Sequence, residues 1–412
     1  MRRAIVIGGG IIGLCAGLEL ARSGYAVTVI EEHGDRTAAS WGNAGHIATE
    51  QVAPLASFAS IRSAPRRRFS AGGALDLPLS GIRAWAPFAV RMIAASRPAR
   101  FAAGSRALAS ILAPSLPAWK DLTELIGAAD LLRRDGHFVA WESDATARSG
   151  RASWGEADTG TTQFASATPD DLNRLRRTIA PSVVDAIRFT GSGQITDLNA
   201  LADALEATLI AHGDTIKRRR ATIALDGDKA TIDGEAPDLL IIAAGAQSGA
   251  LMRAMGYRVP LIAERGYHIR ARADHWPADL PPIAFEDRSM IVTRYADCVQ
   301  AAGFVELNRF DAPPDPRKWD RLEAHVAALG LPIAGPFERW IGARPTLPDY
   351  LPAIGRSRHA RNLIYAFGHQ HLGLTLAPVT AAIVGALARD EAPAMDISPF
   401  DIGRFGANRM TS

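Results

Sequence analysis

The start of the chain decides its fold: Ala4-Ile5-Val6-Ile7 runs directly into Gly8-Gly9-Gly10-Ile11-Ile12-Gly13. The apolar, β-branched run predicts a buried parallel strand, and residues 14–23 continue as a good helix former. The glycines have the G-x-G-x-x-G spacing. Gly8 permits a tight turn, Gly10 lets the backbone approach a pyrophosphate, and Gly13 lets helix and strand pack closely. Phosphates would then lie at the positive N-terminal end of the helix.

A second strand over residues 26–30 ends at Glu31, where a dinucleotide site needs a carboxylate for ribose hydroxyls. Glu32 is the neighbouring alternative, but alternation along the strand favours Glu31 and leaves Glu32 solvated. A glycine-rich turn alone also serves ordinary packing. Here the strand, the helix, the second strand and the acid follow in the required order, so this segment predicts a dinucleotide site.

Small residues are dense after the acid, in Ser40-Trp41-Gly42-Asn43-Ala44-Gly45-His46-Ile47. This density favours backbone that runs against a flat ligand. The amides and the Ser40 hydroxyl could donate to phosphate, and Asn43 to His46 could pass a ring system. The alternative is a loop of small residues packed on the sheet.

Bulk properties exclude several classes of protein. With 412 residues and a net charge of +3, the chain should form two domains, and it carries too little charge to argue for nucleic acid. Cys15 and Cys298 provide neither a metal framework nor a disulfide pattern, which favours a reducing compartment. Arg2 and Arg3 precede an apolar run, as basic residues do in an export signal. Glycines interrupt this run, however, so it is not predicted to be an export signal. No uninterrupted apolar stretch is expected to reach membrane-spanning length. We therefore expect a cytoplasmic protein, or one peripheral at the inner face of a membrane.

The stretch from Val52 to about Ser110 is rich in proline, alanine and arginine, with apolar residues at helical spacing, for example Ile82, Trp85 and Met92. This pattern predicts a helical insertion. A basic amphipathic helix can lie on a membrane surface, although such helices more often cover a core. Both readings stay open.

The later chain returns to buried strands. Residues 239–242 form one, and it ends in Ala243-Ala244-Gly245-Ala246, whose small side chains leave room at the carboxyl edge of the sheet. Strand-like runs broken by turns predict an antiparallel sheet away from the nucleotide, at 262–273, 290–293 and 299–304. A further strand and a closing helix are expected at 363–366 and 378–387.

The chain contains a single glycine fingerprint. An enzyme that reduces flavin with a nicotinamide cofactor usually needs two dinucleotide sites. The electrons should therefore come from an organic substrate, and the bound dinucleotide should be FAD rather than NAD.

Four segments resemble the D-amino acid oxidase and glycine oxidase family of flavoenzymes. They are the opening G-G-G-I-I-G with Glu31, the strand ending 243–248, and the late segments Gly342–Asp349 (G-A-R-P-T-L-P-D) and Gly368–Thr375 (G-H-Q-H-L-G-L-T). The loop 41–46 is similar to the D-amino acid dehydrogenase branch, and the late segments to D-hydroxyproline and D-proline dehydrogenases. The resemblance covers most of the chain and is weakest over 57–180.

The resemblance implies an α/β fold with a doubly wound, Rossmann-like domain that binds FAD non-covalently. That domain would comprise residues 1–56, 185–255 and 340–412. The remaining segments, 57–184 and 256–339, would form an α+β substrate domain on an antiparallel sheet, with the helical insertion. No cysteine lies near the C-terminal flavin loop, so the covalent thioether of sarcosine oxidases is not expected.

Three side chains are implied in catalysis. The family's arginine in the Arg-Pro segment, which clamps the substrate carboxylate, corresponds to Arg344, whose alternative role is an ion pair with Asp349. Tyr267 falls near the pocket, where its phenol could bond the substrate, or it is an ordinary strand aromatic. His46 would face the reactive edge of the flavin, where it could bind substrate or assist loss of the amine proton. It could equally be a buried histidine that satisfies a carbonyl.

The late loop lies against the flavin in relatives. One of His369 and His371 is expected at the pyrimidine end, where negative charge develops on reduction. A metal site there would need further ligands that the sequence does not offer, and none is expected. The expected cofactor contacts are Gly8, Gly10, Ile11, Ile12, Gly13, Glu31, Glu32, Ser40, Asn43, Ala44, Gly45, His46, Ile47, Ala244, Gly245, Gly368, His369, His371, Leu372, Gly373, Leu374 and Thr375.

The expected reaction is hydride transfer from the α-carbon of a D-amino or imino acid to FAD, with cis-4-hydroxy-D-proline or D-proline as first choice of substrate. The imine product would hydrolyse or rearrange outside the protein. Two alternatives stay open: an oxidase of glycine or sarcosine type, and a flavin-carrying subunit of a larger dehydrogenase. The electron acceptor would accordingly be a quinone, oxygen or a partner subunit.

Overall fold

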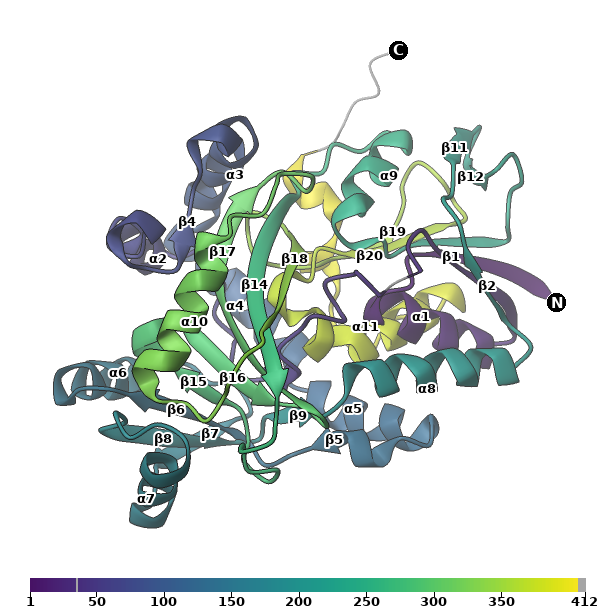
Figure 1. Cartoon of the computed structure of the whole chain (residues 1–412). Coiled ribbons are helices and arrows are strands. Elements are labelled where there is room, and N and C mark those ends of the chain that lie inside the picture. The colour runs from purple at the N-terminus through teal and green to yellow at the C-terminus, as the bar shows by residue number, and fades with distance from the viewer. Residues whose placement is uncertain (35, 407–412) are drawn as a thin grey trace.

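Two large sheets organise the chain, which a computed structural model describes over residues 1–34 and 36–406 (Figure 1). The first is a 6-stranded sheet in the order β10-β2-β1-β13-β20-β19, parallel except for β19. Its strands are β1 (Arg2–Ile7), β2 (Tyr25–Glu31), β10 (Thr215–Arg218), β13 (Leu239–Ile242), β19 (Ala353–Arg356) and β20 (Leu363–Phe367). This order confirms the predicted doubly wound domain.

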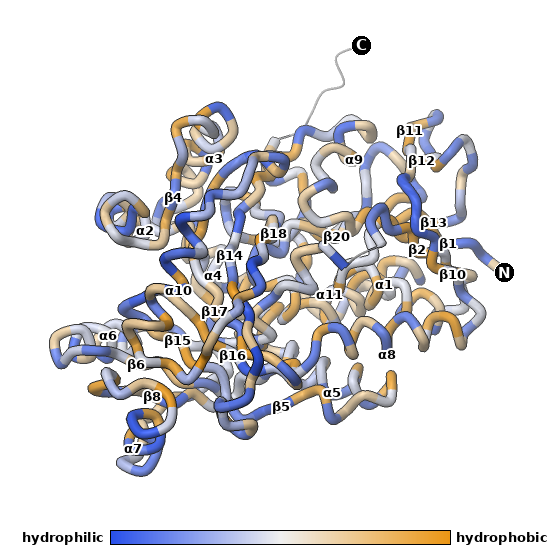
Figure 2. Tube along the Cα trace, viewed as in Figure 1, coloured by the Kyte–Doolittle hydropathy of each residue, from blue (hydrophilic) through white to orange (hydrophobic). Residues whose placement is uncertain are grey.

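Both faces of this sheet are covered, because successive side chains of its strands enter different cores. Val6 and Ile241 pack on the side of α1 (Ile11–Arg22), α8 (Leu198–Ala211) and α11 (Gly373–Ala388). Ile7 and Ile242 pack on the side of α9 (Ser248–Ala254) and the hairpin β11 (Ile223–Asp226) and β12 (Lys229–Ile232). Figure 2 shows apolar residues along β1 and β13, and polar residues in the turn of that hairpin.

The second is a 9-stranded sheet, largely antiparallel, in the order β18-β14-β17-β16-β15-β6-β8-β7, with β4 beside β17. Its strands are β4 (Leu75–Asp76), β6 (His137–Trp141), β7 (Gln163–Ser166), β8 (Asp185–Thr190), β14 (Ile262–Arg272), β15 (Ile283–Phe285), β16 (Met290–Arg294), β17 (Cys298–Asn308) and β18 (Glu338–Thr346). The helix α10 (Arg317–Leu329) packs against β14 and β17.

Two strands fall in a different sheet from the one expected. β8 pairs with β6 and β7, and β18 pairs residue for residue with β14. Both therefore belong to the second sheet, although the boundaries at 185 and 340 assign them to the nucleotide-binding domain. The chain crosses between the sheets after each of these strands, because backbone pairing continues to Thr190 and Thr346.

The helical insertion is present. It comprises α2 (Phe58–Ser63), α3 (Ile82–Ala95), α4 (Pro98–Leu112) and α5 (Ser115–Leu125). Two further helices, α6 (Asp144–Glu156) and α7 (Pro169–Thr178), flank the second sheet, and β3 (His46–Ile47), β9 (Gly193–Ile195) and β5 (Leu132–Arg133) form a small third sheet.

The closing helix begins at Gly373, five residues before the expected start at Pro378. A proline has no N–H, so the carbonyl of Leu374, four residues earlier, has no donor within the helix. Trp119 of α5 supplies one: its Nε1 donates to Leu374 O at 3.0 Å. The helix can therefore continue through Pro378.

The segment Gln370–Ala388 also corrects the expectation that no stretch could span a membrane. It is a helix of 19 residues with mean hydropathy 1.7, which meets that test by length and composition. Its residues are largely buried, because α11 packs against α1, α4, α5 and the first sheet. We read it as the core helix of the nucleotide-binding domain.

Replacing Trp119 by phenylalanine should destabilise the protein by about 2 kcal/mol, because a buried carbonyl loses its donor. Urea unfolding followed by circular dichroism measures the change. Trp276→Phe is the matched control, since Trp276 is also buried but makes no hydrogen bond through its indole nitrogen to any described residue. Equal losses in the two variants would show that the bond to Leu374 contributes nothing.

Candidate active site

A single cavity of 1530 Å³ connects the glycine loop to strands β14 and β18 of the second sheet. Sites for drug-sized ligands measure about 300–1,000 Å³, so this one has room for an extended ligand and a small molecule beside it. The cavity lies at the carboxyl ends of β1, β2 and β13, which is where doubly wound sheets bind ligands.

The glycine loop has the geometry that its sequence predicts. Gly8 has φ +116°, and a Cβ there would lie 2.4 Å from the carbonyl oxygen of Ala243. A Cβ on Gly13 would lie 1.8 Å from the carbonyl oxygen of Gly8. The turn and the close packing of α1 on β1 therefore both require glycine.

Donors at the start of α1 point to an anionic ligand. Ile11 N donates to Ser40 Oγ at 3.1 Å, which leaves the hydroxyl proton of Ser40 able to donate to a phosphate. The amides of Ile12 and Gly13 meet no acceptor from residues 1–34 or 36–406. Together with the positive end of a 12-residue helix, these donors suit a pyrophosphate.

The acid at the end of β2 lies beside this loop. Glu31 Oε2 accepts from Gly9 N at 2.5 Å, and Oε1 accepts from His33 N at 3.1 Å. Glu32 Oε1 lies 3.8 Å from Arg220 Nε. Both acids line the cavity, and the bond to the glycine loop holds Glu31 where a ribose next to the pyrophosphate would lie.

Most of the expected cofactor contacts line the cavity. Those that do are Gly8, Gly10, Ile11, Ile12, Glu31, Glu32, Ser40, Asn43, Ala44, His46, Ala244, Gly245, His369, His371, Gly373 and Leu374. Those that do not are Gly13, Gly45, Ile47, Gly368, Leu372 and Thr375. Neither cysteine lines it. The arrangement fits FAD held without a covalent bond.

The expected cofactor contacts that do not line the cavity lie in the structure that supports its walls. Ile47 and Leu372 are buried in the core, and Thr375 Oγ1 accepts from Ala48 N at 3.0 Å, which ties α11 to the loop that carries His46. Gly45 has φ +72°, and a Cβ there would lie 2.9 Å from the Tyr295 hydroxyl. Gly368 has φ +80° and packs on Leu347.

The loop expected against the ring system is held from the second sheet. The carbonyl oxygen of Asn43 accepts from the Tyr295 hydroxyl at 2.6 Å and from Gln300 Nε2 at 3.0 Å. That of Gly42 accepts from His268 Nδ1 at 3.1 Å, and His268 stacks on Trp340. These bonds hold the loop against the second sheet.

Arg344 is paired, but with a different acid from the one considered. Its Nη1 donates to Glu264 Oε1 at 3.1 Å across the β14–β18 pair, whereas Asp349 accepts from Arg404 Nε at 2.6 Å. Glu264 is 1% exposed and also accepts from the hydroxyls of Thr346 and Tyr350.

The rest of the Arg344 guanidinium faces the cavity. A Cβ on Gly266 would lie 2.2 Å from Arg344 Nη2, so glycine at that position leaves room for the side chain. Nη2 and Nε meet no acceptor in the described part of the chain. Two parallel N–H groups therefore remain for a carboxylate.

Tyr267 falls at the cavity, as expected, and is among its lining residues, but its hydroxyl is bonded to Glu306 and to Asp315 N and not turned to a substrate. Side chains alternate along β14, so the Tyr267 ring packs against Trp319 of α10, on the other side of the strand from Glu264 and His268. Its hydroxyl donates to Glu306 Oε2 at 2.6 Å and accepts from Asp315 N at 3.2 Å. Burial raises its pKa.

Tyr267 instead belongs to a buried polar network beneath the sheet. Lys318, fully buried, lies 2.9 Å from Glu306 and 2.7 Å from Asp76, and Arg265 Nη1 donates to Glu306 at 2.8 Å. These charges compensate one another, and the phenol completes the set.

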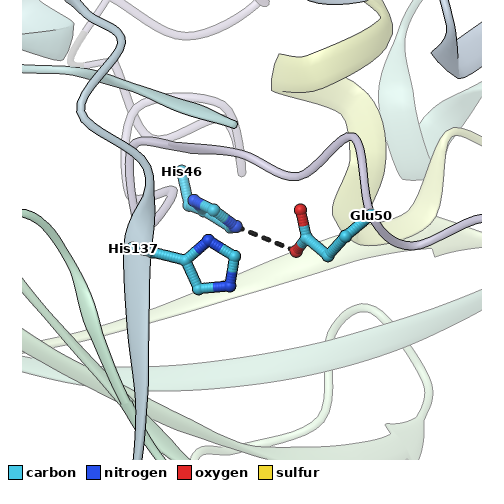
Figure 3. A group of neighbouring side chains, drawn as sticks. All are labelled: His46, Glu50 and His137. Carbon is cyan, nitrogen blue, oxygen red and sulfur yellow. Dashed lines mark hydrogen bonds and ion pairs between the residues drawn. The ribbon is translucent and has the colours of Figure 1, made fainter. Parts of the chain in front are cut away.

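His46 lies in a buried cluster with Glu50 and His137 at the cavity wall (Figure 3). His46 Nε2 is 3.0 Å from Glu50 Oε1, and the rings of His46 and His137 meet edge to face with centroids 4.5 Å apart. His137 Nδ1 is 2.8 Å from Ser192 Oγ, and its ring stacks on Phe189. Nδ1 of His46 and Oε2 of Glu50 are buried without a partner from the described residues.

The charges in this cluster are set by burial and by proximity. Burial alone would raise the pKa of Glu50, but the neighbouring imidazoles more than reverse this and lower it to about 2. Burial lowers the pKa of His137 to about 3, despite the pull of Glu50. At neutral pH the cluster therefore contains a carboxylate bonded to His46 and a neutral His137.

The two histidines of the late loop point in different directions. His369 Nε2 is 3.0 Å from Thr380 Oγ1, whereas His371 Nε2 contacts Gln51 Oε1. Burial lowers the pKa of His369 to about 3 and that of His371 to about 4. Both are neutral hydrogen-bonding side chains at the cavity.

Three buried neutral histidines make stability depend on pH. The pKa values of His137, His369 and His371 are lower in the folded chain than the usual 6.5. Their contribution is therefore present above pH 6.5 and is lost as pH falls toward 3–4. We expect the free energy of unfolding to be about 4 kcal/mol lower at pH 5.5 than at pH 7.5, measured with urea. His369→Gln should remove about a third of that difference, and an unchanged difference would contradict the assignment.

Several residues of the site are absent from the expectations. Glu264, Glu50 and His137 come from three separate segments, and only the strand pairing brings them to the cavity. One of these residues could have been predicted. Side chains alternate between the two faces of a strand, so Glu264 and His268, four residues apart, should lie on the same face of the sheet. No pattern in the sequence links Glu50 to His137.

Over most of its length, the chain is similar in sequence to known proteins. Residues 3–387 match the family DAO, FAD dependent oxidoreductase. The chain is 29% identical over 418 residues to a D-amino-acid oxidase of Bradyrhizobium diazoefficiens, covering 98% of this chain and 99% of the relative. It is 29% identical to D-amino acid dehydrogenase 2 of Pseudomonas aeruginosa, covering 96% and 97%.

Solved structures share the fold. Glycine oxidase from Geobacillus kaustophilus aligns with a TM-score of 0.71 at 19% identity, covering 98% of this chain and 99% of that one. L-Proline dehydrogenase from P. horikoshii aligns with a TM-score of 0.67 at 16% identity, covering 98% and 97%.

Proposed function

Because this chain belongs to the DAO family of FAD-dependent oxidoreductases, we propose that it oxidises a D-amino or imino acid at its α-carbon, with D-proline or cis-4-hydroxy-D-proline as the preferred substrate. Its wider activity, oxidation of a CH–NH or CH–NH₂ donor, is that of the family. The D-configuration is supported by the relatives named D-amino-acid oxidase and D-amino acid dehydrogenase. A glycine- or sarcosine-type oxidase is the second candidate, supported by the shared fold of glycine oxidase.

The observation that carries this proposal is a cavity lined by the guanidinium of Arg344 and by the imidazole of His46, whose Nδ1 is buried without a partner from the described residues. Arg344 binds the substrate carboxylate through the two N–H groups that Glu264 leaves free, and this orients the α-carbon. FAD, when bound, supplies the hydride acceptor.

His46 takes the proton of the substrate ammonium. The carboxylate of Glu50 accepts the Nε2–H of His46, so the lone pair lies on Nδ1, which has no partner among the described residues. A neutral amine is needed because its lone pair forms the C=N bond as the hydride leaves the α-carbon. Glu50 also stabilises the imidazolium that results.

The test is anaerobic mixing of the purified yellow protein with a panel of D- and L-amino acids that includes both prolines and the hydroxyprolines. We expect rapid loss of flavin absorbance with a D-imino acid and none with its L-isomer. Preference for glycine or sarcosine would favour the second candidate. Bleaching by no member would contradict both and favour a flavin-carrying subunit that needs partner chains.

Readmission of air distinguishes between the possible electron acceptors. Rapid return of the colour identifies an oxidase, and slow return identifies a dehydrogenase that passes electrons to a quinone or to a partner subunit. We propose that the protein works in the cytoplasm or at the inner face of the membrane.

A further inference from the structure

Exposed apolar side chains are concentrated in one part of the chain. Of the large hydrophobic residues that the described chain exposes, six lie between residues 55 and 93, with exposed fractions from 41% to 80%. They are Leu55, Phe58, Leu79, Ile82, Val90 and Ile93. We call these residues, with Phe310 at 55% exposure, the apolar patch. In Figure 1, α2 and α3 lie at the opposite end of the molecule from β1 and β2.

The exposed apolar residues of α3 do not belong to the face of the helix that packs on the core. Phe88, Trp85 and Met92 pack on the core beside β17. At about 100° per residue, Ile82, Val90 and Ile93 fall within an arc of about 80° on another side of the helix, and all three are exposed. The helix thus has a second apolar stripe with no partner in the described chain.

The same segment is strongly basic. Residues 52–96 contain six arginines, at 62, 66, 67, 68, 83 and 91, and one acid, Asp76. Asp76 is bonded to Lys318, and none of the six arginines forms an ion pair with the described residues. All six are exposed. Apolar groups between unpaired arginines match the interface of an anionic bilayer.

Three residues of the apolar patch also line the active-site cavity. Leu55, Ile93 and Phe310 are exposed and line the cavity at the same time, and Arg66 and Arg67 line it beside them. A surface that covered the apolar patch would therefore lie directly at the cavity entrance.

We propose that the segment 55–96 docks the protein on an anionic lipid bilayer, with the cavity entrance facing the headgroups. The contact is peripheral, because α2 has 6 residues and α3 has 14, too few to span a bilayer. A second copy of the chain is a poorer occupant: in a two-fold dimer through this patch, unpaired arginines would face arginines. This docking does not depend on the substrate.

Vesicle co-sedimentation of the FAD-loaded protein tests the proposal. At about 0.1 M salt we expect binding to vesicles of phosphatidylcholine with phosphatidylglycerol and little binding to phosphatidylcholine alone. The triple variant Phe58→Asp, Leu79→Asp, Val90→Asp should bind at least tenfold more weakly. Ile210→Asp is the matched control, since Ile210 is 61% exposed on α8, and it should bind as the parent does.

A second variant tests the charges. Changing Arg62, Arg83 and Arg91 to glutamine should weaken partition about a hundredfold, at about fivefold for each arginine. None of the substituted residues lines the cavity, so flavin content and turnover in solution should stay unchanged. Failure of the parent to sediment with anionic vesicles would overturn the proposal. So would equal loss in Ile210→Asp, or a dimer in analytical ultracentrifugation that the triple variant abolishes.

Discussion

Replacing His46 by asparagine is expected to lower kcat by about 10²- to 10⁴-fold while FAD stays bound. The imidazole is held by Glu50 on one side, and its other nitrogen is buried without a partner in the described chain. Asparagine keeps a polar side chain at the cavity wall but cannot accept a proton at neutral pH. The substrate ammonium would then keep its proton, and the amine could not form the C=N bond.

The pH profile separates this role from a structural one. When the pH exceeds the pKa of the substrate amine, the substrate arrives neutral, and the rate of the variant should rise toward that of the parent. Glu50→Gln should show a smaller loss, because the amide oxygen still accepts the Nε2–H but provides no negative charge. His212→Asn, an exposed substitution outside the cavity, is the control. A loss of equal size at every pH would refute proton acceptance by His46.

Replacing Arg344 by alanine is expected to raise KM by about 10²- to 10³-fold with a smaller change in kcat, because two charge-assisted hydrogen bonds to the carboxylate are lost. Arg344→Lys should recover part of the loss, since an ammonium provides charge but not the planar fork. Steady-state kinetics measures both. Binding of pyrrolidine, which lacks the carboxylate, should be the same in the variant and in the parent.

The pairing of Arg344 with Glu264 complicates the alanine variant, because removing one partner leaves a buried carboxylate uncompensated. The double variant Arg344→Ala, Glu264→Gln relieves that charge and retains an acceptor for the hydroxyls of Thr346 and Tyr350. It should fold with FAD bound and show the same increase in KM. A double variant with the parent's KM would show that Arg344 serves only as the partner of Glu264.

The nucleotide-binding half could be predicted from the sequence because its signals are local. The turn at Gly8, the helix that follows, and the acid at Glu31 lie within one short segment, and each restricts the backbone or the ligand by itself. The strands with continuous apolar runs, such as 239–242, were equally clear. Their side chains are buried on both faces, which few other structures allow.

The substrate side depends on contacts between distant segments, so the sequence could not supply it. The acid that holds Arg344 lies 80 residues away, across the β14–β18 pair. Whether Tyr267 or its neighbours face the cavity depends on which side of the sheet α10 covers. The true start of α11 depends on one indole nitrogen that replaces the donor missing at Pro378.

The order of strands in the first sheet has a consequence for the chain as it leaves the ribosome. β1 carries the glycine loop and is made first, but it lies beside β13, and β13 lies beside β20, which ends about 360 residues later. At about 5–20 residues per second, the first strand waits roughly 20–70 s for that part of the sheet. The cavity that fits FAD is also lined by His369, His371 and Leu374, so it is complete only after these residues have been made. During this interval the edge of β1 that later pairs with β13 is open to pairing with other chains, and we expect FAD to bind fully only at a late step in the biogenesis of this protein.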